Sequence, residues 1–398
     1  MKILRVIPSM DPKQGGPCQG IRNSIPAQEK LGVINEVLTL DDPASAFLKQ
    51  DNFIINAIGP SNGPYSYCSG LKDWLKNNLE RFDLIIIHGL WQYHSYTTYK
   101  IWRELKRKSR KAPSIYVMPH GMLDPYFQRA KSRRLKAIRN WIFWKLVEGN
   151  VLNKTSGVLF TCEEELLLAR QTFSPYNPRL ELNVGYGIQP PPYFKHIHSA
   201  DFLDSCSGLD HKNYWLFLSR IHPKKGVDML INAYTQLEQE NPHLPSLVIA
   251  GPGMETAYGK YLRKLAEGKK IYFPGMLEGN SKWGAFYGCN AFILPSHQEN
   301  FGIALVEAMG CKKPVLITNK VNIWREIDEG NGGLICDDTV SGVKNMLQKW
   351  LNFSSDKKLK YGENSYKIYQ SNFEIEHASY KMIEAFKNNY NYERTVIN

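Results

Sequence analysis

The sequence contains few cysteines and no long apolar segment. Its 398 residues include only seven cysteines, and no two of them form a C-x-x-C pair. An odd, scattered set of cysteines favours neither a disulfide framework nor a zinc site, and it is typical of a reducing compartment. No run of eighteen apolar residues occurs, and the segment MKILRVIPSM becomes polar too early for a signal peptide. We therefore expect a cytoplasmic protein without a membrane-spanning helix.

A dinucleotide-binding fingerprint is also absent. The glycine-rich segment DPKQGGPCQG follows an expected first strand, residues 1–8, but it does not contain G-x-G-x-x-G. The hypothesis that the chain binds a nicotinamide cofactor therefore lacks its main sequence evidence. A periplasmic binding protein would share a pair of doubly wound sheets, but it would need the signal peptide that we do not find.

Charge is unevenly balanced in the chain. Fifty Lys and Arg residues against 38 Asp and Glu give a formal net charge of +12. Such an excess favours acidic partners: nucleic acid, anionic lipid or a phosphorylated substrate. No nucleic-acid recognition motif accompanies the charge, so we expect no nucleic-acid partner.

Short apolar runs alternate with helical patterns along the whole chain. This alternation predicts an α/β protein with doubly wound parallel sheets, and the length predicts two domains. The segment GYGIQPPP, residues 185–192, ends in three prolines and predicts the domain boundary. Residues 196–212 are expected to form a polar linker. Strands are expected at 1–8, 37–40, 53–57, 84–88, 114–118, 157–161, 214–218, 247–250, 271–273, 291–294 and 314–318.

The stretch NAFILPSHQENFGIALVEAMGCKKPV, residues 290–315, is the most informative part of the sequence. It predicts a buried strand, a polar turn at 295–300 and a helix that begins near Phe301 and stops before Pro314. The first N–H groups of such a helix suit a phosphate. Glu299 precedes the helix and Glu307 lies inside it, so both can reach one ligand across the helix start. We expect Glu307 to hold a ribose and Glu299 to meet a sugar further along. The backbone donors are those of Gly302, Ile303, Ala304 and Leu305.

The segment SHQENFGIALVEAMGCKKPV resembles the E-x7-E signature of retaining nucleotide-sugar glycosyltransferases of the GT-B fold, family 4. The resemblance implies two Rossmann-like doubly wound domains that face each other across a cleft. Residues 1–190 would bind the acceptor and residues 191–375 the nucleotide sugar, while a C-terminal helix, 376–398, would pack back on the first domain. Asn300 and Phe301 would belong to the donor site with the two glutamates.

Other donor-site residues follow from the same resemblance. Arg220 leaves a strand and Lys225 stands at the mouth of the next helix, so both cations can converge on a diphosphate. They resemble the R-x4-K pair of the family, which holds the leaving nucleotide. Five further residues are expected to contact the donor through backbone that lies close to it: Gly15, Gly16 and Gly251 in glycine-rich loops, and Met276 and Leu277 in PGMLEGN, which resembles the base-reading loop. For Gly15 and Gly16 a plain flexible turn is equally consistent with the residues.

Histidines end two of the expected strands. His120 lies in PHGMLDP, which resembles the family's His-Gly loop, in which the histidine hydrogen-bonds the transferred sugar. His88 lies in IIIHGLW, and with Trp91, Tyr93 and His94 it is a candidate for acceptor contact, since aromatic faces stack on sugars. A packing role for these four residues is an equally good interpretation.

The most basic stretch of the chain is FQRAKSRRLKAIRNWIFWKLVE, residues 127–148. Its apolar residues share a helical spacing, which predicts an apolar face packed on the sheet with solvated charges. The alternative is contact of residues 129–145 with an anionic membrane or a lipid-diphosphate acceptor. The cations are Arg129, Lys131, Arg133, Arg134, Lys136, Arg139 and Lys145, and the apolar positions are Leu135, Ile138, Trp141, Ile142 and Leu146.

The resemblance implies a retaining transfer of a hexose, most simply glucose from UDP-glucose, to a hydroxyl of a saccharide or lipid-diphosphate-saccharide acceptor. PHGMLDP resembles exopolysaccharide-assembly members, so cell-envelope polysaccharide is the expected product. The chain has no D-x-D triplet, the usual metal–diphosphate bridge of the other glycosyltransferase fold, so we expect no metal and no cofactor. The alternatives are a nucleotide-sugar epimerase, a sugar phosphorylase and a non-catalytic nucleotide-binding subunit.

Overall fold

The computed structural model describes residues 1–109, 112–130, 133–209, 213–241 and 243–397, with side chains up to 389. The chain divides into two compact units. Unit 1 comprises Met1–Gly187 and Ile375–Asn398, and unit 2 comprises Ile188–Glu374. Lys131, one of the cations of the basic stretch, and residues 210–212 of the expected linker lie outside the described residues.

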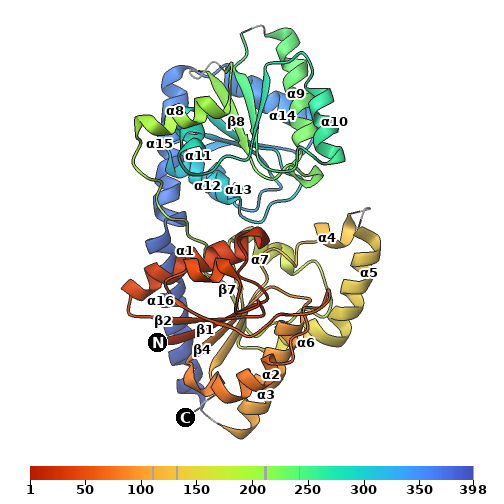
Figure 1. Cartoon of the computed structure of the whole chain (residues 1–398), viewed down its shortest axis with the longest axis vertical. Helices are drawn as coiled ribbons and strands as arrows, with labels where there is room; N and C mark the ends of the chain where they lie inside the picture. Colours follow the sequence, from red (N-terminus) through yellow and green to blue (C-terminus); the bar gives the residue numbers. More distant parts are fainter. Residues whose placement is uncertain (110–111, 131–132, 210–212, 242, 398) are drawn as a thin grey trace. The chain divides into compact units, whose positions relative to one another are not determined.

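Unit 1 is built on a seven-stranded parallel sheet in the order β3-β2-β1-β4-β5-β6-β7 (Figure 1). The predicted doubly wound α/β architecture is confirmed. One strand, β7, has no counterpart in the sequence analysis, because its three residues ELN carry no apolar pattern. The strands are β1 Lys2–Ile7, β2 Ile34–Thr39, β3 Ile54–Ala57, β4 Leu84–His88, β5 Ser114–Met118, β6 Gly157–Phe160 and β7 Glu181–Asn183.

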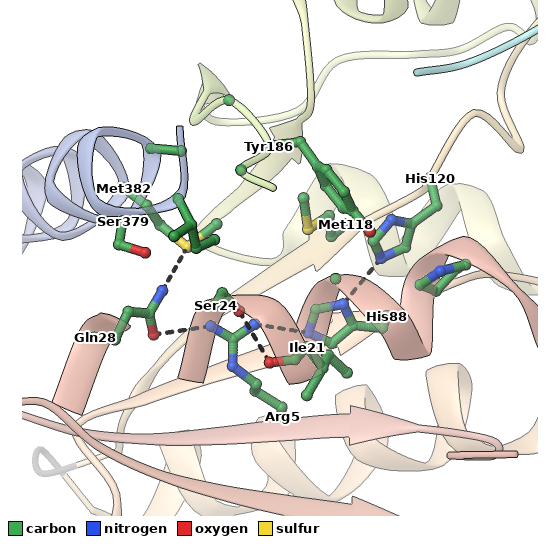
Figure 2. A pocket seen from close by; sticks show the side chains of 16 residues that line it. Arg5, Ile21, Ser24, Gln28, His88, Met118, His120, Tyr186, Ser379 and Met382 are labelled. Atoms are coloured by element: carbon green, nitrogen blue, oxygen red, sulfur yellow. Dashed lines mark hydrogen bonds between the residues drawn. The ribbon is translucent and has the colours of Figure 1, made fainter. Parts of the chain in front are cut away.

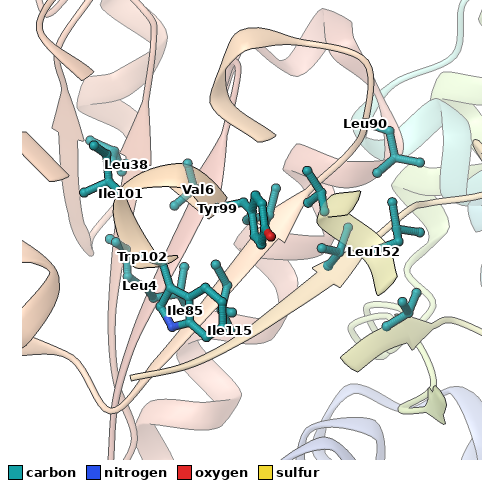
Figure 3. Packing of buried hydrophobic residues seen from close by; sticks show 14 of the residues in the cluster. Leu4, Val6, Leu38, Ile85, Leu90, Tyr99, Ile101, Trp102, Ile115 and Leu152 are labelled. Atoms are coloured by element: carbon teal, nitrogen blue, oxygen red, sulfur yellow. The ribbon is translucent and has the colours of Figure 1, made fainter. Parts of the chain in front are cut away.

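Both faces of this sheet are covered, as the near-continuous apolar strands require. Side chains alternate along β4: Ile85 and Ile87 belong to one buried cluster, and Leu84 and Ile86 to the cluster on the opposite face. Figure 3 shows the first cluster, where Trp102 packs beside Leu4 and Ile115. The helices of unit 1 are α1 Gly16–Lys30, α2 Leu71–Asn78, α3 Tyr93–Lys108, α4 Tyr126–Arg129, α5 Arg134–Phe143, a π-helical turn Trp144–Glu148, α6 Gly149–Lys154, α7 Glu163–Ala169 and α16 Ile375–Ile397.

The C-terminal helix α16 belongs to unit 1, although unit 2 precedes it in the chain. Its side chains Met382, Ile383 and Phe386 are buried in the second cluster of unit 1. The ring of Phe386 lies 5.4 Å from that of Tyr116 on β5. Figure 1 shows α16 beside α1, in agreement with their contact.

Unit 2 contains a six-stranded parallel sheet in the order β10-β9-β8-β11-β12-β13. Its strands are β8 Tyr214–Leu218, β9 Ser246–Ala250, β10 Ile271–Gly275, β11 Ala291–Leu294, β12 Val315–Thr318 and β13 Gly333–Cys336. Its helices are α8 His196–Ser205, α9 Val227–Glu240, α10 Ala257–Leu265, α11 Gly279–Gly288, α12 Ile303–Gly310, α13 Trp324–Glu329, α14 Val340–Leu351 and α15 Ser355–Ile368. The order reverses at β8 and β11, so the loops after these two strands lie at the switch point where such sheets bind ligands.

The expectation of a polar linker at 196–212 is wrong for its first half. Residues 196–205 form α8, which packs closely on α11. The approach is close because Gly284 of α11 faces the His198 carbonyl, and a Cβ at Gly284 would collide with it. Phe202 is buried in this contact. Tertiary packing thus orders a segment whose own pattern is weak.

The expected burial of the apolar face of residues 127–148 is also wrong. The five apolar positions named above are between 45% and 85% exposed. The stretch is divided into α4, α5 and the π-helical turn, and only Trp144 of its tryptophans is buried. Trp144 stacks on Phe173 at 4.7 Å, so this side chain holds the stretch on unit 1 while the rest of its apolar face is exposed.

Candidate functional site

The start of α12 is the centre of the candidate site in unit 2. Its N-cap, Gly302, has φ 83°, a left-handed conformation that favours glycine, and no side chain caps the helix. The hydrogen bond from the Val306 N–H to the Gly302 carbonyl is 3.1 Å long. The N–H groups of residues 302–305 therefore stand at the positive end of the helix, where an anion is stabilised.

Two predicted residues meet beside this helix. The Lys225 ammonium hydrogen-bonds the Glu299 carboxylate, although the two residues are 74 positions apart in the sequence. Both side chains are largely buried, with 9% and 16% exposure. Burial, with the charges of Lys224 and Arg220, lowers the pKa of Lys225 to about 7, while the Glu299 carboxylate favours the charged ammonium. The partly desolvated pair is a strong electrostatic feature of the site.

Glycines allow the loops of the site to approach one another. Gly226, at φ 65°, lies against the Pro295 carbonyl, and a side chain there would collide with it. Gly251, at φ 140°, lies in the same way against Ser219. The N–H of His297 donates to the Lys224 carbonyl at 2.9 Å. The loops after β8, β9 and β11 therefore form one packed edge of the sheet.

Glu307 has a partner that the sequence analysis missed. Lys282 of α11 donates to its carboxylate at 2.9 Å, and the Lys282 ammonium also lies 4.3 Å from the centre of the Trp283 ring. No local signal pointed to Lys282, because it stands 25 positions before Glu307 on another helix. Each glutamate of the E-x7-E pattern is thus paired with a lysine.

The remaining donor-site candidates of unit 2 differ in exposure. Arg220 follows the end of β8 and is exposed. Met276 is 61% exposed, whereas Leu277 is buried with 6% exposure. The side chains of Asn300 and Asn322 hydrogen-bond at 3.2 Å, and Phe301 packs edge-on against Phe373. Asn300 and Phe301 therefore support the turn before α12.

In the candidate site of unit 1, the side chains of Arg5, His88 and His120 meet one after another through their nitrogen atoms (Figure 2). The Arg5 guanidinium contacts His88 Nε2 at 3.4 Å, and His88 Nδ1 lies 2.9 Å from His120 Nε2. Burial lowers the pKa of His120 to about 3, and the Arg5 charge adds to this effect. Burial also lowers the pKa of His88, with contributions from His120 and Arg5. His88 is 2% exposed, so it belongs to this network beneath the surface.

The His-Gly loop is fixed by a residue that the sequence analysis missed. His120 has φ 52° and Gly121 has φ 79°, so the loop runs through left-handed conformations. The Gly121 N–H donates to the Glu165 carboxylate at 2.5 Å, and the N–H and hydroxyl of Thr161 donate to its other oxygen. In the sequence, Glu165 is hidden in the acidic run CEEE.

Trp91 and Tyr93 are half-buried. The Trp91 ring lies 5.5 Å from that of Phe173, and the Tyr93 ring packs between those of Tyr65 and Tyr67. The backbone N–H of Trp91 donates at 2.9 Å to the carboxyl group of Glu148. This carboxyl is fully buried, and burial raises its pKa to about 7. The hydrogen bond holds Trp91 in a conformation with φ 71°. Much of the surface of both aromatic side chains is therefore in contact with other residues of unit 1.

Gly15 and Gly16 begin α1. Gly15 has φ 85° and serves as the N-cap without a side-chain hydrogen bond. No heavy atom of the described residues would lie within 4 Å of a Cβ at either position, so the backbone here is accessible. The Gly16 carbonyl accepts a hydrogen bond of 2.6 Å from the Tyr186 hydroxyl.

Comparison with known proteins agrees with this geometry. Residues 206–368 match the family model of glycosyl transferases group 1. The matched segment contains Arg220, Lys225, Lys282, Glu299 and Glu307. In a separate comparison, the chain is 28% identical over 187 residues, which cover 45% of it and 46% of the relative, to the O-antigen chain mannosyltransferase C of Escherichia coli. The chain spans less than half the length of the curated relatives that it matches.

Solved structures extend the likeness to the whole chain. HepE of Anabaena in complex with UDP-glucose has a TM-score of 0.72 at 17% identity, covering 98% of this chain and 100% of HepE. A glycosyltransferase from Rickettsia africae has a TM-score of 0.75 at 13% identity, covering 98% of both chains. The two Rossmann-like units of this chain thus have the GT-B fold.

Proposed function

We propose that this group 1 homologue is a retaining glycosyltransferase of the family 4 type that moves a hexose from a nucleoside diphosphate sugar to an acceptor hydroxyl. One observation carries the proposal. The glutamates of the E-x7-E pattern flank the uncapped start of α12, and each is paired with a lysine, Glu299 with Lys225 and Glu307 with Lys282. Carboxylates suit sugar hydroxyls, and the cations with the helix N–H groups suit a diphosphate.

The proposed chemistry relies on charge stabilisation. Arg220, Lys225 and the N–H groups of residues 302–305 would hold the diphosphate as negative charge develops on it. Glu307 would accept from the ribose hydroxyls and Glu299 from the transferred sugar. Because Glu307 would be committed to ribose, the pair would not act as the nucleophile and acid of a retaining glycosidase. The acceptor oxygen would instead bond to the anomeric carbon on the face from which the diphosphate departs, and the diphosphate would take the acceptor's proton. Because the new bond forms on the face where the old one breaks, the anomeric configuration is retained.

For the donor, we propose UDP-glucose, with UDP-galactose, UDP-N-acetylglucosamine and GDP-mannose as the competitors. The UDP-glucose complex of the structural neighbour HepE supports the first choice. The mannosyltransferase among the relatives supports testing GDP-mannose beside it. The proposed acceptor is a saccharide or lipid-diphosphate-saccharide of envelope or exopolysaccharide synthesis.

A thermal-shift series with UDP, GDP, ADP and NAD tests the nucleotide site. A ligand at 100 times its Kd stabilises by about 2.7 kcal/mol, which corresponds to roughly 5 to 10 °C for a domain of about 150 to 250 residues. We expect a shift with UDP and none with NAD. The absence of a shift with every nucleotide would contradict the proposal.

A transfer assay separates the proposed reaction from its alternatives. We expect UDP release to depend on an added acceptor, and proton NMR of the product to show the anomeric configuration of the donor. Conversion of the UDP-sugar to its epimer without an acceptor would instead indicate an epimerase. Turnover that requires inorganic phosphate would indicate a phosphorylase.

We also propose that α5 and the following π-helical turn rest on an anionic membrane. No helix among the described residues is long and apolar enough to span a bilayer. However, Leu135, Trp141 and Leu146 are 85%, 56% and 71% exposed. The cations Arg134, Lys136, Arg139 and Lys145, which stand between and beside them in the sequence, are exposed as well. Exposed apolar side chains among cations suit an interfacial helix, with about 1 kcal/mol from each Lys or Arg near an anionic surface.

Vesicle sedimentation tests this surface. We expect binding to vesicles with 30% phosphatidylglycerol, weaker binding to pure phosphatidylcholine, and release by salt. The double variant Leu135→Ser/Leu146→Ser should lose binding, because it removes the two most exposed apolar side chains. Leu359→Ser is the matched control, since Leu359 is 69% exposed in unit 2. Equal binding by both variants would refute the membrane surface.

A further inference from the structure

A cavity in unit 1 contains a buried cation with an unusual set of partners (Figure 2). Arg5 lies within the apolar strand KILRVI, and its side chain is buried beneath α1. Its Nε donates to Asn35 at 3.0 Å, and its Nη2 donates to the Gln28 amide oxygen at 2.9 Å. Its Nη1 faces His88 Nε2. All of these partners are neutral.

No carboxylate forms an ion pair with Arg5 among the residues that the structure describes. Burying a guanidinium without a counter-ion is unfavourable, so such a residue is retained at a cost to stability. Three neutral acceptors reduce the cost because they satisfy donors on three of its nitrogens. The hydrogen bond from Arg5 to His88 also determines which ring nitrogens of His88 and His120 carry a proton.

The hydrogen bonds leave one consistent set of proton positions. Arginine can only donate, so His88 Nε2 must accept. A neutral imidazole carries one proton, which in His88 must then lie on Nδ1 and point to His120 Nε2 at 2.9 Å. His120 Nε2 therefore accepts, and the proton of neutral His120 lies on its own Nδ1.

The ring of His120 is also fixed from its backbone. The left-handed His120–Gly121 loop is held by Glu165, as described above. His120 Nδ1 has no hydrogen-bond partner among the described residues, and the side chain lines the same cavity. One ring nitrogen is thus occupied by His88, and the other is available to a ligand.

We propose that Arg5 and His88 are positioning residues that fix His120 as its Nδ1–H tautomer, so that it presents a hydrogen-bond donor to an oxygen of the bound sugar. The identity of that oxygen as a sugar hydroxyl rests on the proposed function. The tautomer itself does not. His120 would then orient its ligand without charge and without exchanging a proton with it.

This arrangement predicts that His120 does not titrate near neutral pH. Burial and the Arg5 charge hold the pKa of His120 near 3, so its charge does not change between pH 5 and 8. Burial is the larger of the two causes and remains in Arg5→Met, so the pKa of His120 should rise in this variant but stay below the usual value of about 6.5. His120 should therefore titrate at a higher pH in Arg5→Met than in the native chain.

Long-range proton–nitrogen NMR of 15N-histidine-labelled protein tests the proposal directly. We expect neutral Nδ1–H tautomers for His88 and His120 from pH 5.5 to 8, assigned with the His88→Asn and His120→Asn variants. In Arg5→Met, both rings should gain Nε2–H population. Arg81→Met is the matched control, because Arg81 is a half-exposed arginine of the same unit paired with Glu36. An Nε2–H His120 in the native protein would overturn the proposal.

A second pair of variants covers the case in which Arg5→Met does not fold. In His88→Asn the amide oxygen can accept from Arg5 while its N–H donates to His120, so the His120 tautomer should persist. His88→Leu offers no donor, and the Nε2–H form should appear. Unchanged His120 tautomers in folded His88→Leu would refute the role of His88.

Kinetics then tests the part that rests on the proposed function. We expect kcat to fall about 10-fold in His88→Leu and less in His88→Asn, a typical loss for a residue that orients a functional imidazole. The Kd for UDP should be unchanged in both, since the nucleotide would bind in unit 2. A protein that lacks transferase activity but shows the expected tautomers would contradict the proposed function and leave the histidine arrangement standing.

Discussion

In unit 2, the candidate site residues meet as ion pairs, Lys225 with Glu299 and Lys282 with Glu307. In unit 1, the buried Arg5 meets only neutral groups, and burial, with the Arg5 charge as a smaller cause, keeps His88 and His120 uncharged. The first arrangement can exchange partners, because a diphosphate can replace a carboxylate on lysine and a sugar hydroxyl can replace lysine on the carboxylate. The second arrangement is fixed, and it orients a neutral donor.

This difference indicates a division of roles between the units. Charged, partly desolvated pairs suit recognition of a charged ligand whose arrival neutralises them. A neutral histidine in a left-handed loop suits recognition of hydroxyls, where direction matters more than charge. Changes to the lysines and glutamates of unit 2 should therefore affect binding and charge stabilisation, while changes in unit 1 should affect orientation and acid stability.

The largest expected effect is that of Lys225→Met. We expect turnover to fall about 100- to 1000-fold, comparable to the loss of a group that stabilises developing negative charge. The Kd for UDP should rise as well, since the same ammonium would contact the diphosphate. Lys260→Met, at an exposed lysine of α10 in the same unit, is the control for steady-state kinetics. Equal turnover in the two variants would remove Lys225 from the site.

The two glutamates should separate binding from transfer. Glu307→Gln should weaken UDP binding about 10-fold, because an amide with one acceptor oxygen replaces the carboxylate that we propose to hold ribose. Glu299→Gln should instead lower kcat more than it weakens UDP binding, as should His120→Ala in unit 1. Calorimetry with UDP and initial rates with the UDP-sugar check both. The opposite pattern, with Glu299 controlling UDP affinity, would reverse the assigned roles.

The same contrast explains what the sequence could predict. The fold followed from apolar runs such as IIIH, which are local, and Arg220, Lys225, Glu299 and Glu307 stand within recognisable motifs. The partners did not follow, since Lys282 lies 25 positions from Glu307 and Arg5 lies 83 positions from His88. Only a folded sheet brings these residues together.

Two sequence-based predictions, for residues 127–148 and for residues 196–212, were wrong for a similar reason. Periodicity identified the apolar face of residues 127–148 but not whether anything covers it, and its side chains are exposed. Conversely, α8 has a weak pattern and is ordered by contact with α11. One signal was nevertheless local, because an arginine inside the apolar strand KILRVI marks a buried charge and could have identified Arg5.

Acid stability should distinguish the histidine network of unit 1 from the ion pairs. Burial lowers the pKa of His94, which is fully buried and donates to the His88 carbonyl at 2.9 Å, to about 4. Below pH 6.5 the unfolded chain binds a proton that the folded unit excludes. The free energy of unfolding should therefore fall between pH 6.5 and 4, by up to about 1.4 kcal/mol per pH unit for each such histidine.

His94→Gln should reduce this pH dependence, because the glutamine can still donate to the carbonyl but does not titrate. Urea unfolding at pH 5 and 7, followed by hydrogen exchange of β4 peptides, measures it. His377→Gln is the control, since His377 is exposed on α16. An unchanged slope in His94→Gln would mean that His94 is not held neutral.

The smallest expected effect is that of metal removal. If Arg220, Lys225 and the start of α12 carry the diphosphate charge by themselves, then turnover in 5 mM EDTA should stay within about 2-fold of turnover with Mg²⁺, because these groups replace the metal's role in charge stabilisation. Initial rates with UDP-glucose and an acceptor, in both buffers, measure the ratio. Complete loss of activity that Mg²⁺ restores would show that the cations of unit 2 are insufficient, and Lys225→Met with and without Mg²⁺ would then reveal whether metal and lysine share the same phosphate.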